Sequence, residues 1–203
     1  NNEDKYISSK NVILSAGTIG TAQILMKSKL SKNVGKNFQI HPTIKVVAQF
    51  DDQINYENMG VPTHQVQEFF PKFVLGCSIS NKEHLRIAML DHPQNIKLID
   101  EKWQNMAVYY AMIIPEGTGS INNIPFFKDP ILKYNLTKND LRNLSEGMKC
   151  LTKLLFKAGA TQIYPCFQNA PTIKNIQQID SLPEYIDVNG SRLMSVHLFS
   201  SCP

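Results

Sequence analysis

Histidines are the side chains of this 203-residue chain best suited to acid–base chemistry, because an imidazole gains or loses a proton near neutral pH. His197 is the best placed of them. It follows alternating apolar residues that are typical of a strand, and small residues come directly after it, so a turn can present its ring to a cleft. A role as a general base is one interpretation of His197, and an ordinary structural histidine is the alternative.

The other four histidines carry weaker signals. His41 precedes Pro42 and is expected to be a hydrogen-bonded turn residue at the entry to a strand. His64, His84 and His92 are expected in polar, exposed connections. No HExxH pair and no close group of metal-binding residue types occurs, so the sequence predicts no metal site.

Nucleophilic chemistry has little support. Ser200 or Cys202 paired with a histidine would suit a hydrolase of α+β fold, but no GxSxG elbow and no catalytic-cysteine signature is present. The four cysteines are widely spaced without a CxxC pair, which predicts free and mostly buried thiols.

A small-residue turn near the N-terminus is suited to a phosphate-bearing ligand. The apolar run at 12–14 predicts a buried strand, and Thr21 is a candidate N-cap for a helix that continues to about residue 28. Between them, the small residues from Ala16 let the backbone approach a ligand, and amides at a helix start favour a pyrophosphate. The alternative is that Gly17 and Gly20 only make a tight turn.

The elements that must position these residues are mostly strands, with connections suited to antiparallel pairing. One long helix is predicted at 138–158, because its leucines recur at helical spacing and Gly159 ends it. Trp103, Tyr109 and Tyr110 line a pocket or, as we favour, pack in the sheet core. Strands are predicted at 43–50, 72–79, 85–91, 106–114, 120–122, 162–164 and 193–199, with a long loop at 51–72.

Composition narrows the class of protein. Apolar residues make up 42% of the chain, which is enough to bury a core. The 21 basic residues outnumber the 17 acidic ones by only four and are scattered, which does not favour a nucleic-acid partner. No apolar run approaches the roughly 20 residues of a membrane span, so we expect a soluble protein. The compartment, cytoplasmic or periplasmic, stays open.

Four stretches, in order, resemble the glucose-methanol-choline (GMC) family of flavin-dependent oxidoreductases. VILSAGTIGTAQILMKS at 12–28 is similar to the family's VILSAGAIGSPQLLLLSG, and VGKNFQIHP at 34–42 is similar to VGRNLQDHP. Asp129-Pro130, the YNLT at 134–137 and Asp140 resemble a substrate-domain passage of the family. HLFSSCP at 197–203 resembles the start of the motif HxxGTCxMG.

The resemblance implies an α+β fold with part of a flavin-binding α/β domain at 1–42. It implies a substrate domain at 43–190, built on a mainly antiparallel sheet flanked by helices, and a return toward the flavin domain at 191–203. It further implies FAD as cofactor and an alcohol or sugar as the small-molecule substrate, whose CH–OH carbon gives a hydride to the flavin. His197 matches the family's catalytic base, and Ala16, Gly17 and Thr18 are implied to approach FAD. Oxygen, a quinone or a cytochrome stays open as electron acceptor.

The chain also departs from the family's pattern. Neither GxGxxG nor the family's second catalytic His or Asn occurs in these residues. We therefore expect a middle to C-terminal fragment of an enzyme, with catalysis in the full-length parent and little or none in the 203 residues alone. The alternative is a non-catalytic carbohydrate-binding or scaffold module that retains the substrate-domain fold. Individual substitutions against the family are Ala22 for Pro, Lys29 and Ser31 for glycines, Ile40 for an acidic residue, and Ser200-Ser201 for Gly-Thr.

Overall fold

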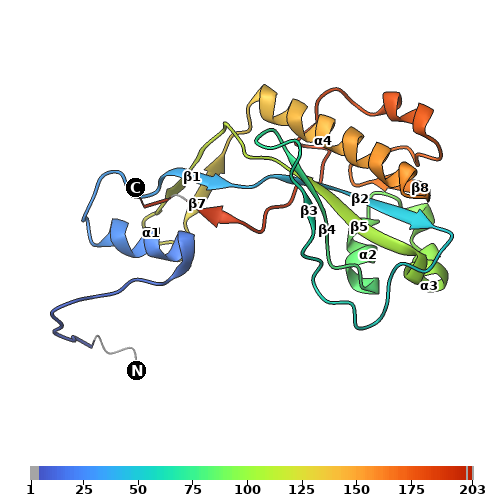
Figure 1. Cartoon of the computed structure of the whole chain (residues 1–203). Helices are drawn as coiled ribbons and strands as arrows, with labels where there is room; N and C mark the ends of the chain where they lie inside the picture. Colours follow the sequence, from blue (N-terminus) through green and yellow to red (C-terminus); the bar gives the residue numbers. More distant parts are fainter. Residues whose placement is uncertain (1–4, 200, 203) are drawn as a thin grey trace. The chain divides into compact units, whose positions relative to one another are not determined.

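The computed structural model describes residues 5–199 and 201–202. The chain forms two compact units: unit 1 contains residues up to Gln39, Gly119–Tyr134 and the chain from Phe199 onward, and unit 2 contains Ile40–Thr118 and Asn135–Leu198. Each unit combines helices with antiparallel strand pairs (Figure 1). The predicted α+β fold is confirmed.

Unit 2 is built on a five-stranded sheet with the order β3-β4-β5-β2-β8. β2, predicted at the same residues, lies between β5 and β8 with nearly all of its side chains buried. Val46 of β2 is opposite Tyr109 on one side and Pro165 on the other. β-Branched residues suit such a strand because both of its faces are packed. The strands are β2 (Thr43–Phe50), β3 (Gln65–Val66), β4 (Val74–Cys77), β5 (Met106–Met112) and β8 (Ala160–Pro165).

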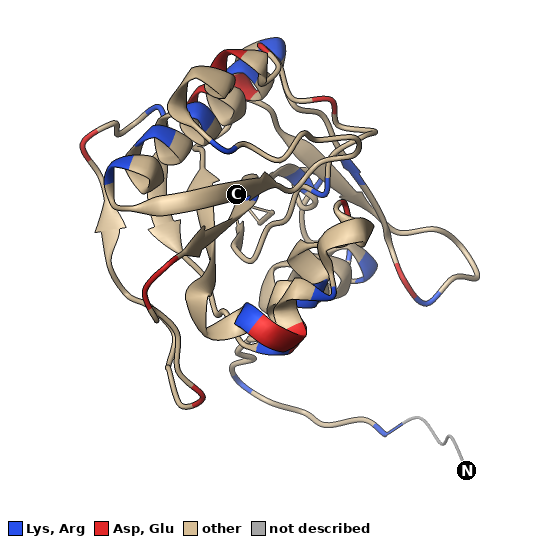
Figure 2. Ribbon diagram, turned by 90° about the vertical axis from the view of Figure 1, so that its right-hand side faces the viewer, with Lys and Arg blue, Asp and Glu red and all other residues tan. Residues whose placement is uncertain are grey.

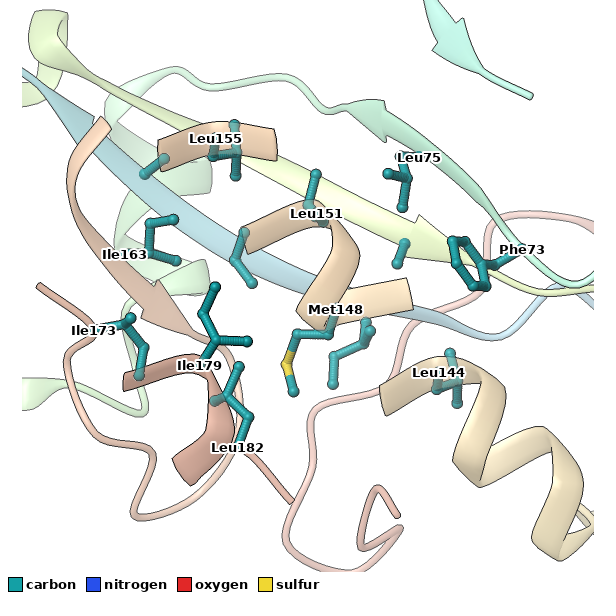
Figure 3. Packing of buried hydrophobic residues seen from close by; sticks show 14 of the residues in the cluster. Phe73, Leu75, Leu144, Met148, Leu151, Leu155, Ile163, Ile173, Ile179 and Leu182 are labelled. Atoms are coloured by element: carbon teal, nitrogen blue, oxygen red, sulfur yellow. The ribbon is translucent and has the colours of Figure 1, made fainter. Parts of the chain in front are cut away.

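Helix α4 (Lys138–Lys157) covers one face of this sheet and confirms the long predicted helix. Figure 3 shows its apolar residues directed at the strands and at the segment around the short helix η3 (Ile176–Ser181). Gly147 permits the close packing, because a Cβ there would lie 2.9 Å from the Cβ of Ala111 on β5. Leu144, Met148, Leu151 and Leu155 of α4 belong to this core.

The opposite face carries α2 (Lys82–Ala88) and α3 (Leu98–Lys102), with the short helices η1 (Pro93–Asn95) and η2 (Trp103–Asn105). The strand predicted at 85–91 is wrong. Asn81 caps a helix instead, since its side chain accepts from the His84 amide at 2.9 Å, and the helical turn buries both Leu85 and Met89. Trp103 is buried in this second core, as we favoured from the sequence.

Unit 1 combines α1 (Gly17–Lys27) with a sheet in the order β7-β6-β1-β9. The strand predicted at 12–14 is wrong: Val12 is 77% exposed and Ile13 is 89% exposed. A buried strand needs neighbours for its backbone, and the structure pairs no other described strand with this run. The strand expected at 193–199 is also much shorter. The strands of this sheet are β1 (Lys36–Ile40), β6 (Gly119–Asn122), β7 (Ile131–Tyr134) and β9 (Leu198–Phe199).

Charged residues do not gather on one element. Figure 2 shows Lys and Arg spread over helices and loops, with Asp and Glu between them. Within the part of the chain that the structure describes, none of the helices has both the length and the apolar character needed to cross a bilayer.

A buried carboxylate connects α4 to the turn that follows β5. Asp140 is fully buried and accepts hydrogen bonds from the amides of Glu116 (2.8 Å), Gly117 (3.0 Å) and Thr137 (2.8 Å). The Thr137 side chain in turn accepts from the Asp140 amide at 3.1 Å, which completes a capping box. This carboxylate therefore fixes both the start of α4 and the turn.

Replacement of Asp140 by Ala should lower the free energy of unfolding by about 3 kcal/mol or more, because hydrogen bonds to a charged group are lost and buried amides stay unpaired. Urea denaturation measures the loss. Asp180→Ala, at an exposed position, is the matched control and should change stability by less than about 0.5 kcal/mol. Equal stabilities of the two variants would contradict this role of Asp140.

Candidate active site

Two histidines that are 156 residues apart in sequence meet in unit 2. The Nδ1 atoms of His41 and His197 are 3.1 Å apart, and the two rings are nearly perpendicular, with 5.3 Å between their centroids. His41 lies between β1 and β2, and His197 directly precedes β9. The structure thus brings the predicted base, His197, against a histidine that we expected to be only a turn residue.

Backbone hydrogen bonds hold this pair. The His41 amide donates to the His197 carbonyl at 3.2 Å, while Thr43 and Met194 exchange two bonds of 2.9 and 3.0 Å. The segment before His197 therefore runs antiparallel to the start of β2. Because β2 is fixed between two other strands, the contact gives the imidazoles a rigid support.

The contact constrains how the pair holds protons. In a bond between two Nδ1 atoms, one ring must carry the proton on Nδ1 and the other must offer a lone pair. The pair therefore accommodates one added proton, but two would leave both Nδ1 atoms as donors and break the contact. Burial, and then the charge of His197, lowers the pKa of His41 below its usual value of 6.5, which favours a neutral His41.

A cavity of about 320 Å³ lies beside His197, within the size range of small-molecule sites. Its floor is the sheet face that carries Thr43, Lys45, Tyr110 and Met112. Tyr110, which we favoured as sheet core, therefore lines a pocket. Val61, Pro62, Gln65, Cys77–Ile79, Met194 and Val196 complete the wall. The cavity thus has a proton acceptor, His197, in a mostly apolar lining with a few polar groups.

The predicted cofactor residues Ala16, Gly17 and Thr18 lie at the start of α1 in unit 1. Ala16 and Gly17 are exposed, and the first turn of the helix has no acidic residue. Gly17 has a left-handed backbone (φ +72°) that favours glycine, with open space where a Cβ would be. Thr21 lies inside the helix rather than at its N-cap and accepts from the Ala16 amide at 3.2 Å, so that expectation is wrong.

The turn after His197 contacts this helix start within unit 1. Ser201, in the stretch similar to HxxGTC, donates through Oγ to the Thr18 carbonyl at 2.7 Å. Its own carbonyl accepts from the Gly35 amide at 2.7 Å. Ser201 is buried, so these bonds connect three of the four stretches that carry the family resemblance.

The remaining candidate residues do not join a site. His92 is fully buried, with Nε2 2.9 Å from the Pro165 carbonyl, so the expectation of an exposed histidine is wrong there. Cys202 is exposed, and Ser200 lies outside the described residues. Over residues 5–199 and 201–202, no three His, Cys, Asp or Glu side chains are grouped so that they could hold a metal ion.

A cavity of this size that is lined by a histidine is a candidate small-molecule site. Residues 1–43 match the family model described as GMC oxidoreductase. An uncharacterized GMC-type oxidoreductase of Sinorhizobium fredii, y4nJ, is 30% identical over 197 residues, which cover 95% of this chain and 38% of that protein. The chain is thus similar to GMC-type oxidoreductases over nearly its whole length, which is the resemblance that the sequence motifs indicated.

Two further relatives match most of the chain. The long-chain-alcohol oxidase FAO1 of Arabidopsis thaliana is 26% identical over 170 residues, 77% of this chain and 22% of that protein. The uncharacterized protein MJ1450 of Methanocaldococcus jannaschii is 28% identical over 160 residues, 79% of this chain and 39% of that protein. The chain thus spans well under half the length of each of these curated relatives.

Replacement of His197 by Asn should raise the pKa of His41, because the charge that lowers it is removed. The value should stay below 6.5, since burial is the larger cause and persists. Imidazole proton shifts followed by NMR across the pH range measure this, and His64→Asn, at an exposed histidine, should leave the pKa of His41 unchanged. An unchanged His41 titration in the His197 variant would show that the two rings do not interact.

Proposed function

We propose that the whole protein is an FAD-dependent oxidoreductase that oxidises a CH–OH group, with His197 as the general base. The observation that carries this proposal is the His41–His197 pair beside a cavity large enough for a small alcohol. Similarity to GMC-type oxidoreductases supports the reaction class, and one relative is named as an alcohol oxidase.

The open start of α1 fits the proposed cofactor. Ala16, Gly17 and Thr18 would let the backbone approach FAD, since Ala16 and Gly17 are exposed and there is open space where a Gly17 Cβ would be. When bound, FAD supplies the acceptor for the hydride that leaves the alcohol carbon. Position and proton transfer are the tasks of the chain's own residues.

His197 would take the hydroxyl proton on the ring nitrogen that does not contact His41. Its Nδ1 then donates to the neutral His41 ring, which orients the imidazolium and disperses its charge. Met112 and Met194, which line the cavity, would contact the apolar part of the alcohol. His41 is thus a positioning residue in this scheme.

In the full-length protein, His197→Gln should slow flavin reduction by the alcohol by about 10²- to 10⁴-fold, the usual contribution of a general base. Stopped-flow absorbance gives the rate, and bound flavin should be retained. His84→Gln, at an exposed histidine, is the matched control and should keep the wild-type rate. An undiminished rate in the His197 variant would refute the role of His197 as general base. A full-length protein that is purified without flavin would favour the carbohydrate-binding or scaffold alternative.

The 203-residue chain on its own should show no substrate-dependent dye reduction, even with added FAD. The physical reason is that a GxGxxG turn, which grips the pyrophosphate of FAD, does not occur in these residues. A dye-reduction assay with the purified chain tests this, with the full-length protein as positive control. Turnover by the short chain would overturn the expectation.

A further inference from the structure

A row of four residues crosses the sheet on the cavity side. Lys45 on β2 is opposite Tyr110 on β5, Tyr110 is opposite Gly76 on β4, and Gly76 is opposite Gln65 on β3. Residues paired in this way point to the same face of a sheet. Three of the four carry polar side chains, and those three line the cavity beside His197.

Gly76 determines the direction of the Tyr110 ring. A Cβ on Gly76 would lie 2.5 Å from the Tyr110 hydroxyl, so only glycine allows the ring to lie over β4. There the hydroxyl accepts a hydrogen bond from Gln65 Nε2 at 2.7 Å. Tyr110 therefore leans toward β3 and away from Lys45, its neighbour on β2, and keeps its own O–H available as a donor.

Lys45 of β2 is half-buried. Among the residues that the structure describes, no carboxylate oxygen lies within ion-pair distance of it. Burial lowers the pKa of Lys45, because the charged form loses hydration there. A half-buried ammonium of this kind is stabilised by an opposite charge that a ligand can bring.

The neighbouring groups do not supply that charge. Burial raises the pKa of the Cys166 thiol to about 12, so this neighbour of Lys45 is neutral. Asp91, whose charge also acts on Cys166, is paired with Arg192 at 3.0 Å. Neither Cys166 nor Asp91 therefore balances the charge of Lys45.

We infer that the cavity binds a hydroxycarboxylic acid, with the substrate carboxylate paired to Lys45 and its hydroxyl directed to His197. Tyr110, which leans toward β3, leaves Lys45 accessible to this carboxylate, and Met112 and Met194 contact the carbon chain between the two ends. This inference rests on the proposed function for the direction of the hydroxyl, but the pairing with Lys45 does not depend on the flavin.

Binding of glutarate, a dicarboxylate without a hydroxyl, tests the anion site without any redox step. Calorimetry on the full-length protein should give a dissociation constant that rises about tenfold or more in Lys45→Met, as expected when one partner of a charge pair is removed. Lys45→Arg should retain binding. Lys133→Met, at an exposed lysine of β7, is the control and should match the wild type. No binding by the wild type, or equal binding by Lys45→Met, would overturn the inference.

Oxidation of matched substrates then separates this inference from the proposed function. The kcat/KM for flavin reduction should be about tenfold higher for 6-hydroxyhexanoate than for 1,6-hexanediol, and the ratio of the two values should fall to about one in Lys45→Met. Oxidation of both compounds without preference would refute the carboxylate site and leave the proposed function intact. Glutarate binding without oxidation of either compound would refute the proposed function instead.

Discussion

The antiparallel backbone contact between the start of β2 and the segment 194–197 is the constraint on which the candidate site depends. The two bonds between Thr43 and Met194, with the bond from His41 to the His197 carbonyl, bring together parts of the chain that are far apart in sequence. β2 cannot shift to accommodate a different contact, because β5 and β8 pair with it on both sides. The contact between the two imidazoles is therefore held in place by a strand that is itself fixed on both sides.

Successive side chains of β2 point to opposite faces of the sheet, so that one set packs in the larger core and the other faces the cavity and the second core. Ile44, Val46 and Ala48 face α4 and belong to the larger core, whereas Thr43 and Lys45 face the cavity and Val47 faces α2 and α3. A shift of β2 by one residue would exchange these roles and remove Lys45 from the cavity. The register with β5 thus fixes both the core and the polar row, and Gly76 then sets the orientation of Tyr110 within that row.

The sequence predicted β2, β5 and α4 because their apolar periodicity and caps are local signals. It missed α2, since the run at 85–90, which is apolar except for Arg86, is compatible with a strand, and the Asn81 cap decides in favour of a helix. The motif indicated His197. His41 was expected to be only a turn residue, because a contact across 156 residues gives no signal in the sequence around it. Lys45 was missed because its significance depends on burial and on partners that are absent among the described residues.

The tautomers of the two histidines test the central claim most directly. Long-range ¹H–¹⁵N NMR spectra above pH 7 distinguish a ring protonated on Nδ1 from one protonated on Nε2. We predict that one ring of the His41–His197 pair carries its proton on Nδ1 and the other on Nε2, as a bond between the two Nδ1 atoms requires. Two rings that both carry the proton on Nε2 would contradict the account, because neither could then donate to the other.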